Sequence, residues 1–172
     1  EDAVKTYVGS IYQVGNPEAG KRMVEALEGL GQQDGLLGQL VQHFSDCHPI
    51  VKVEILRLLT RVRAPEAATI ITQSILDGDR KVRVTAMELA GKSQTKSAVP
   101  HLLPILAHQS RFSGVDEDDE LQEVTCRALG NIGDLSAVAV LLEVANPASF
   151  LKRTKSDPVR TAAIMALGEF SQ

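Results

Sequence analysis

The chain has 172 residues and a formal net charge of −4, with 44% hydrophobic but only 3% aromatic residues. This length allows a continuous core, and a core of small and aliphatic side chains suits closely packed helices. No run of about 18 apolar residues is present, which excludes a membrane-spanning helix, and the negative charge with no tryptophan argues against a nucleic-acid-binding groove.

Apolar residues recur at helical spacing and predict alternating helices of two kinds. Helices of the second kind share the pattern Val-Arg-x-x-Ala-x-x-x-x-Gly, which is clearest from Val82 and recurs from Leu121 and Val159. Weaker copies without the glycine start at Ala19 and Val51. Each is preceded by a predicted helix of the first kind, in the segments AVKTYVGSIYQV, GLLGQLVQHF, PEAATIITQSIL, SAVPHLLPIL and SAVAVLLEVA.

The pattern starts at residues 19, 51, 82, 121 and 159, so successive starts are 32, 31, 39 and 38 residues apart. Repetition at such a period indicates stacked helical pairs that bury a shared core. We expect one domain over residues 1–172, with units of about 1–31, 32–63, 64–92, 93–133 and 134–172. We also expect the domain to be part of a longer protein.

On these residues the chain resembles the HEAT-repeat family, in particular the short bacterial type also found in phycobilisome lyases. The resemblance rests on VRVTAMELAG with SAVPHLLPIL, on ALGNIGDLSAVAVLL and on DPVRTAAIMALG. It implies an all-α fold, a right-handed α-α superhelix or solenoid of about five helical pairs. It further implies a bacterial scaffold or regulatory module that binds a protein, is not an enzyme and needs no cofactor. The alternative is an enzyme-accessory module of the bilin lyase or chaperone type.

Two other activities of HEAT-like proteins do not fit. Deoxyhypusine hydroxylase-like enzymes bind iron through His-Glu dipeptides, whereas the four histidines here are followed by Phe44, Pro49, Leu102 and Gln109. DNA glycosylases of this fold need a basic concave face with aromatic residues, which this composition lacks. We therefore expect a protein partner and no nucleic acid or membrane.

Aspartate and arginine residues mark the turns before two helices of the second kind. Asp79 is placed to cap the helix from Val82, because a carboxylate accepts bonds from the first free amides of a helix. In the family, the matching Asp and Arg residues usually pair locally and hold the turn. We assign this structural role to Asp79, Arg83, Asp157 and Arg160, and an anion site is the alternative.

Two enlarged turns carry inserted loops, SRFSGVDEDDE from Ser110 and ASFLKRTKSD from Ala148. One loop is acidic and the other basic, and each contains a phenylalanine. The two loops either neutralise each other and the adjacent helix end, or form a partner-binding edge with aromatic anchors. The candidate partner-binding residues of this edge are Phe112, Phe150, Asp116, Asp118, Lys152 and Arg153.

A second candidate surface follows from aligning the helices of the second kind. Six residues after each start, the chain has Glu25, Arg57, Glu88, Arg127 and Met165. This alternation predicts a ladder of charges across the concave surface. The ladder either fixes the register of the helices, since exposed ion pairs contribute only about 0–1 kcal/mol each, or forms a mixed-charge groove for a protein segment.

The cysteines and histidines indicate structure rather than a metal site. The segment HFSDCH, residues 43–48, has zinc-ligand types but no second cluster to complete a site, so we interpret it as the turn before a helix. Cys47 and Cys126 are expected to be free buried thiols, which favours the cytoplasm. At the other end of the chain, Ile164 and Leu167 have no following helix to cover them, so self-association through the C-terminal helix is a further hypothesis.

Overall fold

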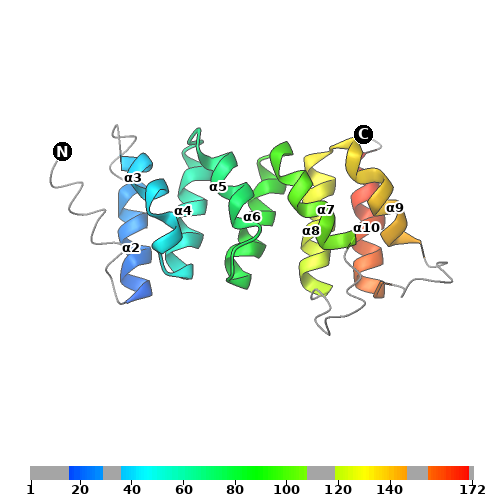
Figure 1. Cartoon of the computed structure of the whole chain (residues 1–172), viewed down its shortest axis with the longest axis horizontal. Coiled ribbons are helices and arrows are strands. Elements are labelled where there is room, and N and C mark those ends of the chain that lie inside the picture. Colours follow the sequence, from blue (N-terminus) through cyan, green and yellow to red (C-terminus); the bar gives the residue numbers. More distant parts are fainter. Residues whose placement is uncertain (1–15, 29–35, 108–118, 147–154, 171–172) are drawn as a thin grey trace. The chain divides into compact units, whose positions relative to one another are not determined.

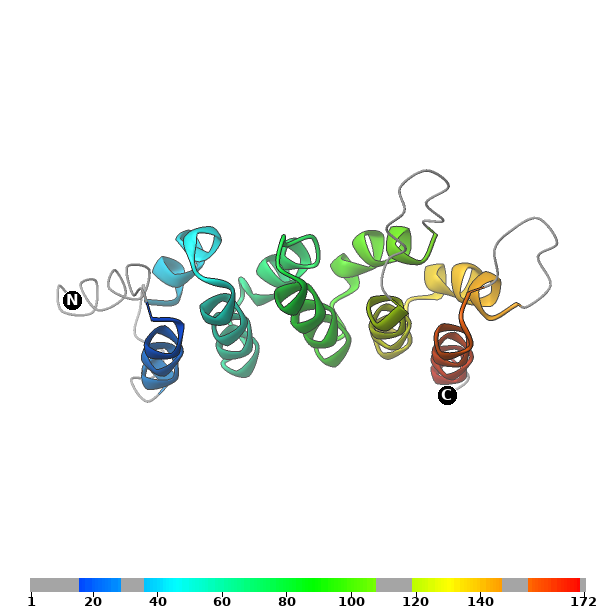
Figure 2. The same cartoon turned by 90° about the horizontal axis from the view of Figure 1, so that it is seen from below.

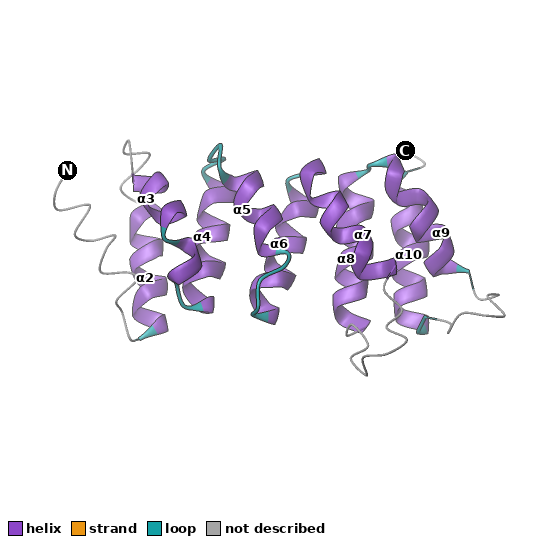
Figure 3. Cartoon of the chain, viewed as in Figure 1, coloured by secondary structure: helices purple, strands orange, loops and turns teal. Residues whose placement is uncertain are grey.

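A computed structural model describes residues 16–28, 36–107, 119–146 and 155–170, and within these ranges the chain forms helices joined by short turns (Figure 1, Figure 3). The chain divides into two compact units, Glu1–Ala86 and Met87–Gln172. The boundary falls inside one helix of the second kind, α6 (Arg80–Lys92). None of the helices described is long and apolar enough to cross a membrane.

The first unit contains helices of both kinds. α4 packs on α2 and on α5, and the buried side chains Ile55, Leu56, Leu59 and Ile71 fill the space between them. Such burial is the main source of helix stability in a protein of this type. The described elements are α2 (Pro17–Glu28), α3 (Leu36–Gln42), a 3₁₀ turn (Phe44–Asp46), α4 (Pro49–Arg61), α5 (Ala67–Ser74) and the start of α6.

The second unit has two layers of helices (Figure 2). α8 (Asp119–Ile132) and α10 (Asp157–Glu169) lie side by side in one layer. α7 (Val99–Ala107) and α9 (Val138–Ala145) lie in the other layer, where they contact each other, and α9 also packs on α10. Leu102, Leu129 and Leu141 are fully buried between the layers. The elements are the end of α6, a 3₁₀ turn (Lys96–Ala98), α7 (Val99–Ala107), α8 (Asp119–Ile132), a 3₁₀ turn (Leu135–Ala137), α9 (Val138–Ala145) and α10 (Asp157–Glu169).

Helices of the second kind approach each other closely in the second unit because glycine removes a side chain from the contact. A Cβ atom added at Gly91 would lie 3.0 Å from Cα of Ala128 in α8. At Gly130 it would lie 2.9 Å from both Cα and Cβ of Ala166 in α10. The distances at Gly130 are shorter than real Cβ atoms show, and the distance at Gly91 is unusually tight, so the glycine of the sequence pattern allows the close spacing of these helices.

The described helices confirm the predicted alternation of two kinds, with small changes at their ends. The segment from Pro65 begins its helix at Ala67, and the segments from Ser97 and Ser136 begin with 3₁₀ turns. The first predicted helix, within residues 1–15, lies outside the described residues. The all-α repeat class is confirmed, while the predicted handedness and unit boundaries stay predictions.

Candidate functional site

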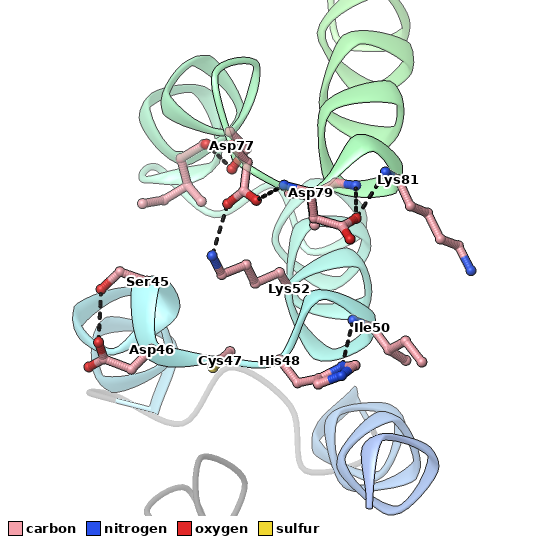
Figure 4. A network of polar contacts seen from close by, with 12 residues as sticks. Ser45, Asp46, Cys47, His48, Ile50, Lys52, Asp77, Asp79 and Lys81 are labelled. Carbon is pink, nitrogen blue, oxygen red and sulfur yellow. Dashed lines mark hydrogen bonds and ion pairs between the residues drawn. The ribbon is translucent and has the colours of Figure 1, made fainter.

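A network of polar contacts joins α4 to the turn between α5 and α6 in the first unit (Figure 4). Lys52 Nζ in α4 donates a 2.9 Å hydrogen bond to Oδ2 of Asp77, which lies in the turn between α5 and α6. Asp77 Oδ1 accepts a 2.8 Å hydrogen bond from the amide of Asp79. The side chains of Lys52 and Asp77 are only 14% exposed, and Lys52 Nζ also lies 5.7 Å from the ring centre of Phe44. The network therefore ties α4 to the turn that precedes α6.

The charge of Asp77 is stabilised by its partners. Burial acts to raise its pKa, but the hydrogen bonds from Lys52 and from the Asp79 amide outweigh burial, with help from the charges of Lys52 and Arg83. The net effect is a lowered pKa. Asp77 therefore stays ionised and bound to Lys52 at neutral pH, which suits a structural ion pair and not an acid-base catalyst.

The aspartates of the turns act locally, as the sequence predicts. Asp79 Oδ1 accepts hydrogen bonds from the amides of Lys81 at 2.9 Å and Val82 at 3.1 Å, so it caps α6. In the part of the chain described, Asp79 does not pair with Arg83, because its carboxylate is used for capping and the Arg83 charge acts on Asp77 instead.

The corresponding pair before α10 forms as predicted. Arg160 Nη1 lies 3.0 Å from Oδ1 of Asp157, one turn away on α10. The Arg160 Nε group also donates a 3.5 Å hydrogen bond to the carbonyl oxygen of Ala145 at the end of α9. Arg160 thus links α9 to α10, which is a structural role.

The HFSDCH segment forms the turn before α4, which confirms its interpretation. His48 Nδ1 accepts a 3.3 Å hydrogen bond from the amide of Ile50 and caps α4. Cys47 and Cys126 are both free and buried, and burial raises their pKa values to about 11 and about 12. These thiols are therefore protonated and unreactive at neutral pH. Among the described residues, no three His, Cys, Asp or Glu side chains are grouped as a metal ion would require.

The solvent-facing side of α8 and α10 combines charge, amide and apolar groups. We call it the α8–α10 face and define it by Glu123, Arg127, Asn131, Met165 and Glu169. Arg127 Nη1 lies 3.6 Å from Glu123 Oε2 on the same helix. The side chain of Met165 is 69% exposed, although apolar side chains of this size are usually buried. The face therefore offers polar groups beside an uncovered apolar side chain.

An open depression of about 380 Å³ adjoins this face where α6, α8 and α10 end. Its floor exists because Gly91 and Gly130 bring the helices together without side chains. Gln94 Nε2 donates a 3.3 Å hydrogen bond to the carbonyl oxygen of Asn131 at its edge. The lining residues are Gly91, Lys92, Gln94, Gly130, Asn131, Gly133 and Glu169.

The depression is lined by hydrogen-bonding and charged groups. Its lining consists of glycine backbone, the amide side chains of Gln94 and Asn131, and the charged side chains of Lys92 and Glu169. The Asn131 side chain is a hydrogen-bond donor and acceptor, and Lys92 and Glu169 supply opposite charges. Such groups can bind a polypeptide backbone and its side chains.

The predicted ladder of charges differs from the ion pairs that form. Arg57 pairs with Glu54 at 2.9 Å and Arg127 pairs with Glu123 at 3.6 Å, each within its own helix. Glu25 likewise approaches Lys21, at 4.0 Å on α2. In unit 2, Glu88, Arg127 and Met165 are exposed, as a surface role requires. Their use in binding stays a prediction.

The loop residues predicted to bind a partner lie outside the described residues. They are Phe112, Phe150, Asp116, Asp118, Lys152 and Arg153. Sequence reasoning missed the Lys52–Asp77 pair, since the two residues are 25 positions apart and no local pattern joins them. It also missed the depression, although the repeated glycine was a signal that side chains are absent there.

The comparison with known families gives a match to part of the chain. The family model described as HEAT repeats matches residues 37–113. No curated protein shows a significant match to the chain.

Proposed function

Residues 37–113 belong to the HEAT-repeat family, and from this premise we propose that the chain is a non-catalytic scaffold module that binds a polypeptide segment on its α8–α10 face. HEAT repeats generally mediate protein–protein interaction or scaffolding. The observation that carries the proposal is the open polar depression lined by Asn131 and Glu169, together with the exposed Met165, which lies four residues before Glu169 on α10.

The chemistry of the face favours an extended peptide over a small molecule. A small-molecule site is usually enclosed and mostly apolar, whereas this depression is open and lined largely by polar groups. Asn131 and Gln94 supply amide groups, and Arg127 with Glu123 supplies both charges. An exposed methionine adapts its shape to an apolar side chain of the partner. A short segment of mixed charge with one apolar anchor matches these groups.

The inserted loops are a second candidate surface for the same function. Their support is the sequence pattern of Phe112 and Phe150 with charges of opposite sign around them. Buried aromatic anchors contribute much of the affinity at protein interfaces. Substitutions on the α8–α10 face and in the inserted loops can show which of the two surfaces binds the partner.

A random-peptide library displayed on phage, selected against the chain, tests the proposal. We expect selected peptides to lose at least about tenfold in affinity on Met165→Glu, because replacing an apolar anchor with a charged carboxylate should cost more than about 1.4 kcal/mol. Arg127→Glu should lower the affinity for selected peptides that carry an acidic residue.

Leu135→Glu is the matched control, since Leu135 is another exposed apolar side chain of unit 2, 77% exposed in the turn before α9. It should leave the affinity unchanged. Equal losses in Met165→Glu and Leu135→Glu would contradict the proposal. So would a loss confined to a Phe112→Ala/Phe150→Ala variant, which would move the site to the loops.

A further inference from the structure

The depression on the α8–α10 face lies at the carboxyl ends of three helices. α6 ends at Lys92, α8 at Ile132 and α10 at Glu169. Every lining residue belongs to the last turn of one of these helices or to the two residues that follow it. Helix ends of the same polarity therefore meet around one open space.

This arrangement makes the surroundings of the depression negative. The carboxyl end of a helix carries a partial charge of about −0.5, because its last carbonyl groups have no partner within the helix. The last turns of α8 and α10 have no basic residue, whereas that of α6 has Lys92. Lys92 and Glu169 cancel in formal charge, which leaves the partial negative charges of the helix ends uncompensated within the lining.

The wall of the depression is rich in hydrogen-bond acceptors. Carbonyl oxygens of the helix ends, the amide oxygen of Asn131 and the carboxylate of Glu169 all accept hydrogen bonds. Gly91 and Gly130 leave the floor without side chains. Gln94 Nε2 already donates to the carbonyl oxygen of Asn131 at 3.3 Å, so this amide donor is used within the wall itself. The acceptors that remain suit a ligand that brings donors and a positive charge.

We propose that the depression binds the guanidinium group of an arginine in the partner segment. This inference rests on the proposed peptide-binding function and names a side chain that the peptide carries. A guanidinium group has five N–H donors in a planar fork, which suits several acceptors around one space. A lysine ammonium group has three donors and is more strongly hydrated, so lysine should bind less well. A carboxylate would face helix ends of its own sign.

The position of Met165 sets the spacing of the peptide residues. Met165 stands four residues before Glu169 on α10, which is about 6 Å along the helix axis. In an extended chain, residues i and i+2 point to the same side and lie about 6.6–6.8 Å apart. A peptide along α10 therefore places arginine in the depression and an apolar side chain on Met165 when one residue separates the two. The expected motif is Arg-x-apolar or its reverse.

Peptides selected from the phage-displayed library are the probes for this motif. We expect them to carry an arginine separated by one residue from an apolar residue. Replacing that arginine with citrulline keeps the length of the side chain and removes its charge. This replacement should lower the affinity for the wild-type chain at least about fivefold, which isothermal titration calorimetry measures.

Variants of the lining separate a charge effect from a defect in the fold. Glu169→Gln should reduce the difference in affinity between the arginine and citrulline peptides, because the two charges no longer act on each other. Asn131→Asp should raise the affinity for the arginine peptide at least about twofold and leave the citrulline peptide unchanged, since it adds a carboxylate. A damaged fold would weaken both peptides alike. Glu143→Gln, which removes an exposed carboxylate from α9, is the matched control and should change neither affinity.

The outcomes distinguish this inference from the proposed function. Selected peptides that depend on Met165 but carry no arginine would overturn the inference and leave peptide binding standing. Equal affinities of the arginine and citrulline peptides would do the same. If the selection yields no peptide that Met165→Glu weakens, the proposed function fails and the inference fails with it.

Discussion

The two units hold their turns by ion pairs of different burial. In the first unit, Lys52 and Asp77 are each 14% exposed and join residues far apart in the sequence. In the second unit, Arg160 pairs with Asp157 one helical turn away, and the Asp157 side chain is 91% exposed. Because water screens an exposed pair more than a largely buried one, the first pair should contribute more to stability.

The close contacts between helices also differ between the two units, in the kind of atom that faces the glycine. In the first unit, a Cβ atom at Gly20 would lie 2.6 Å from Cγ2 of Val51, which is a side-chain atom. In the second unit, a Cβ atom at Gly130 would meet backbone atoms of Ala166. A side chain adjusts more easily than a helix backbone. The first unit therefore depends more on its polar pair, and the second more on its glycines.

The largest effect is expected from Asp77→Ala. Removing the carboxylate leaves Lys52 half-buried without its partner and frees the Asp79 amide, which should lower the unfolding free energy by about 2–3 kcal/mol. Urea denaturation measures this loss. In a double-mutant cycle with Lys52→Met, the two effects should be less than additive. Additive effects would show that the pair does not tie α4 to the turn.

Gly130→Ala should lower the unfolding free energy by about 1–3 kcal/mol, because α8 and α10 must move apart. Gly20→Ala should cost about 1 kcal/mol or less, since the Val51 side chain can shift and alanine favours the helix. Thermal unfolding of both variants, followed by circular dichroism, measures the difference. A larger cost at Gly20 than at Gly130 would reverse the comparison of the two units.

The pH dependence of the unfolding free energy measures how much the ionised Asp77 carboxylate contributes to stability. Its pKa is lowered in the folded state, so its stabilisation is complete above the unfolded value of about 3.9 and is lost as pH falls through the folded pKa. Wild type and Asp77→Asn should therefore converge in stability below about pH 4. A constant difference down to pH 2 would exclude ionisation as the cause.

Arg160→Ala should have the smallest effect, about 0–1 kcal/mol, because its partner Asp157 is exposed to water. The 3.5 Å hydrogen bond to the Ala145 carbonyl adds little at that length. Chemical denaturation beside Asp77→Ala compares the two pairs directly. If Arg160→Ala lowered the unfolding free energy as much as Asp77→Ala, exposure to water would not explain the difference between the two ion pairs.

The sequence predicts the helices better than it predicts the site. The repeated pattern from Val82, Leu121 and Val159 places the helices of the second kind because helical periodicity is a local property. Asp79 is identified as a cap for the same reason. The Lys52–Asp77 pair depends on the packing of α4 against a turn 25 residues later, which no local pattern contains.

The glycines of the repeated pattern show a difference that the structure reveals and the sequence pattern does not. Gly91, Gly130 and Gly168 occupy one position of the pattern, and the sequence alone treats them alike. The structure separates them, since a Cβ atom added at either of the first two would meet a neighbouring helix, whereas one added at Gly168 meets no atom of the described residues within 4 Å. The depression beside Asn131 follows from those contacts and needs coordinates to be seen.

Peptide binding on the α8–α10 face can be mapped directly from the changes in amide chemical shifts when a selected peptide is added to the chain. We expect the largest changes at Arg127, Asn131, Met165 and Glu169, on the α8–α10 face and its depression. Changes confined to residues 108–118 and 147–154, or to α7 and α9, would contradict it.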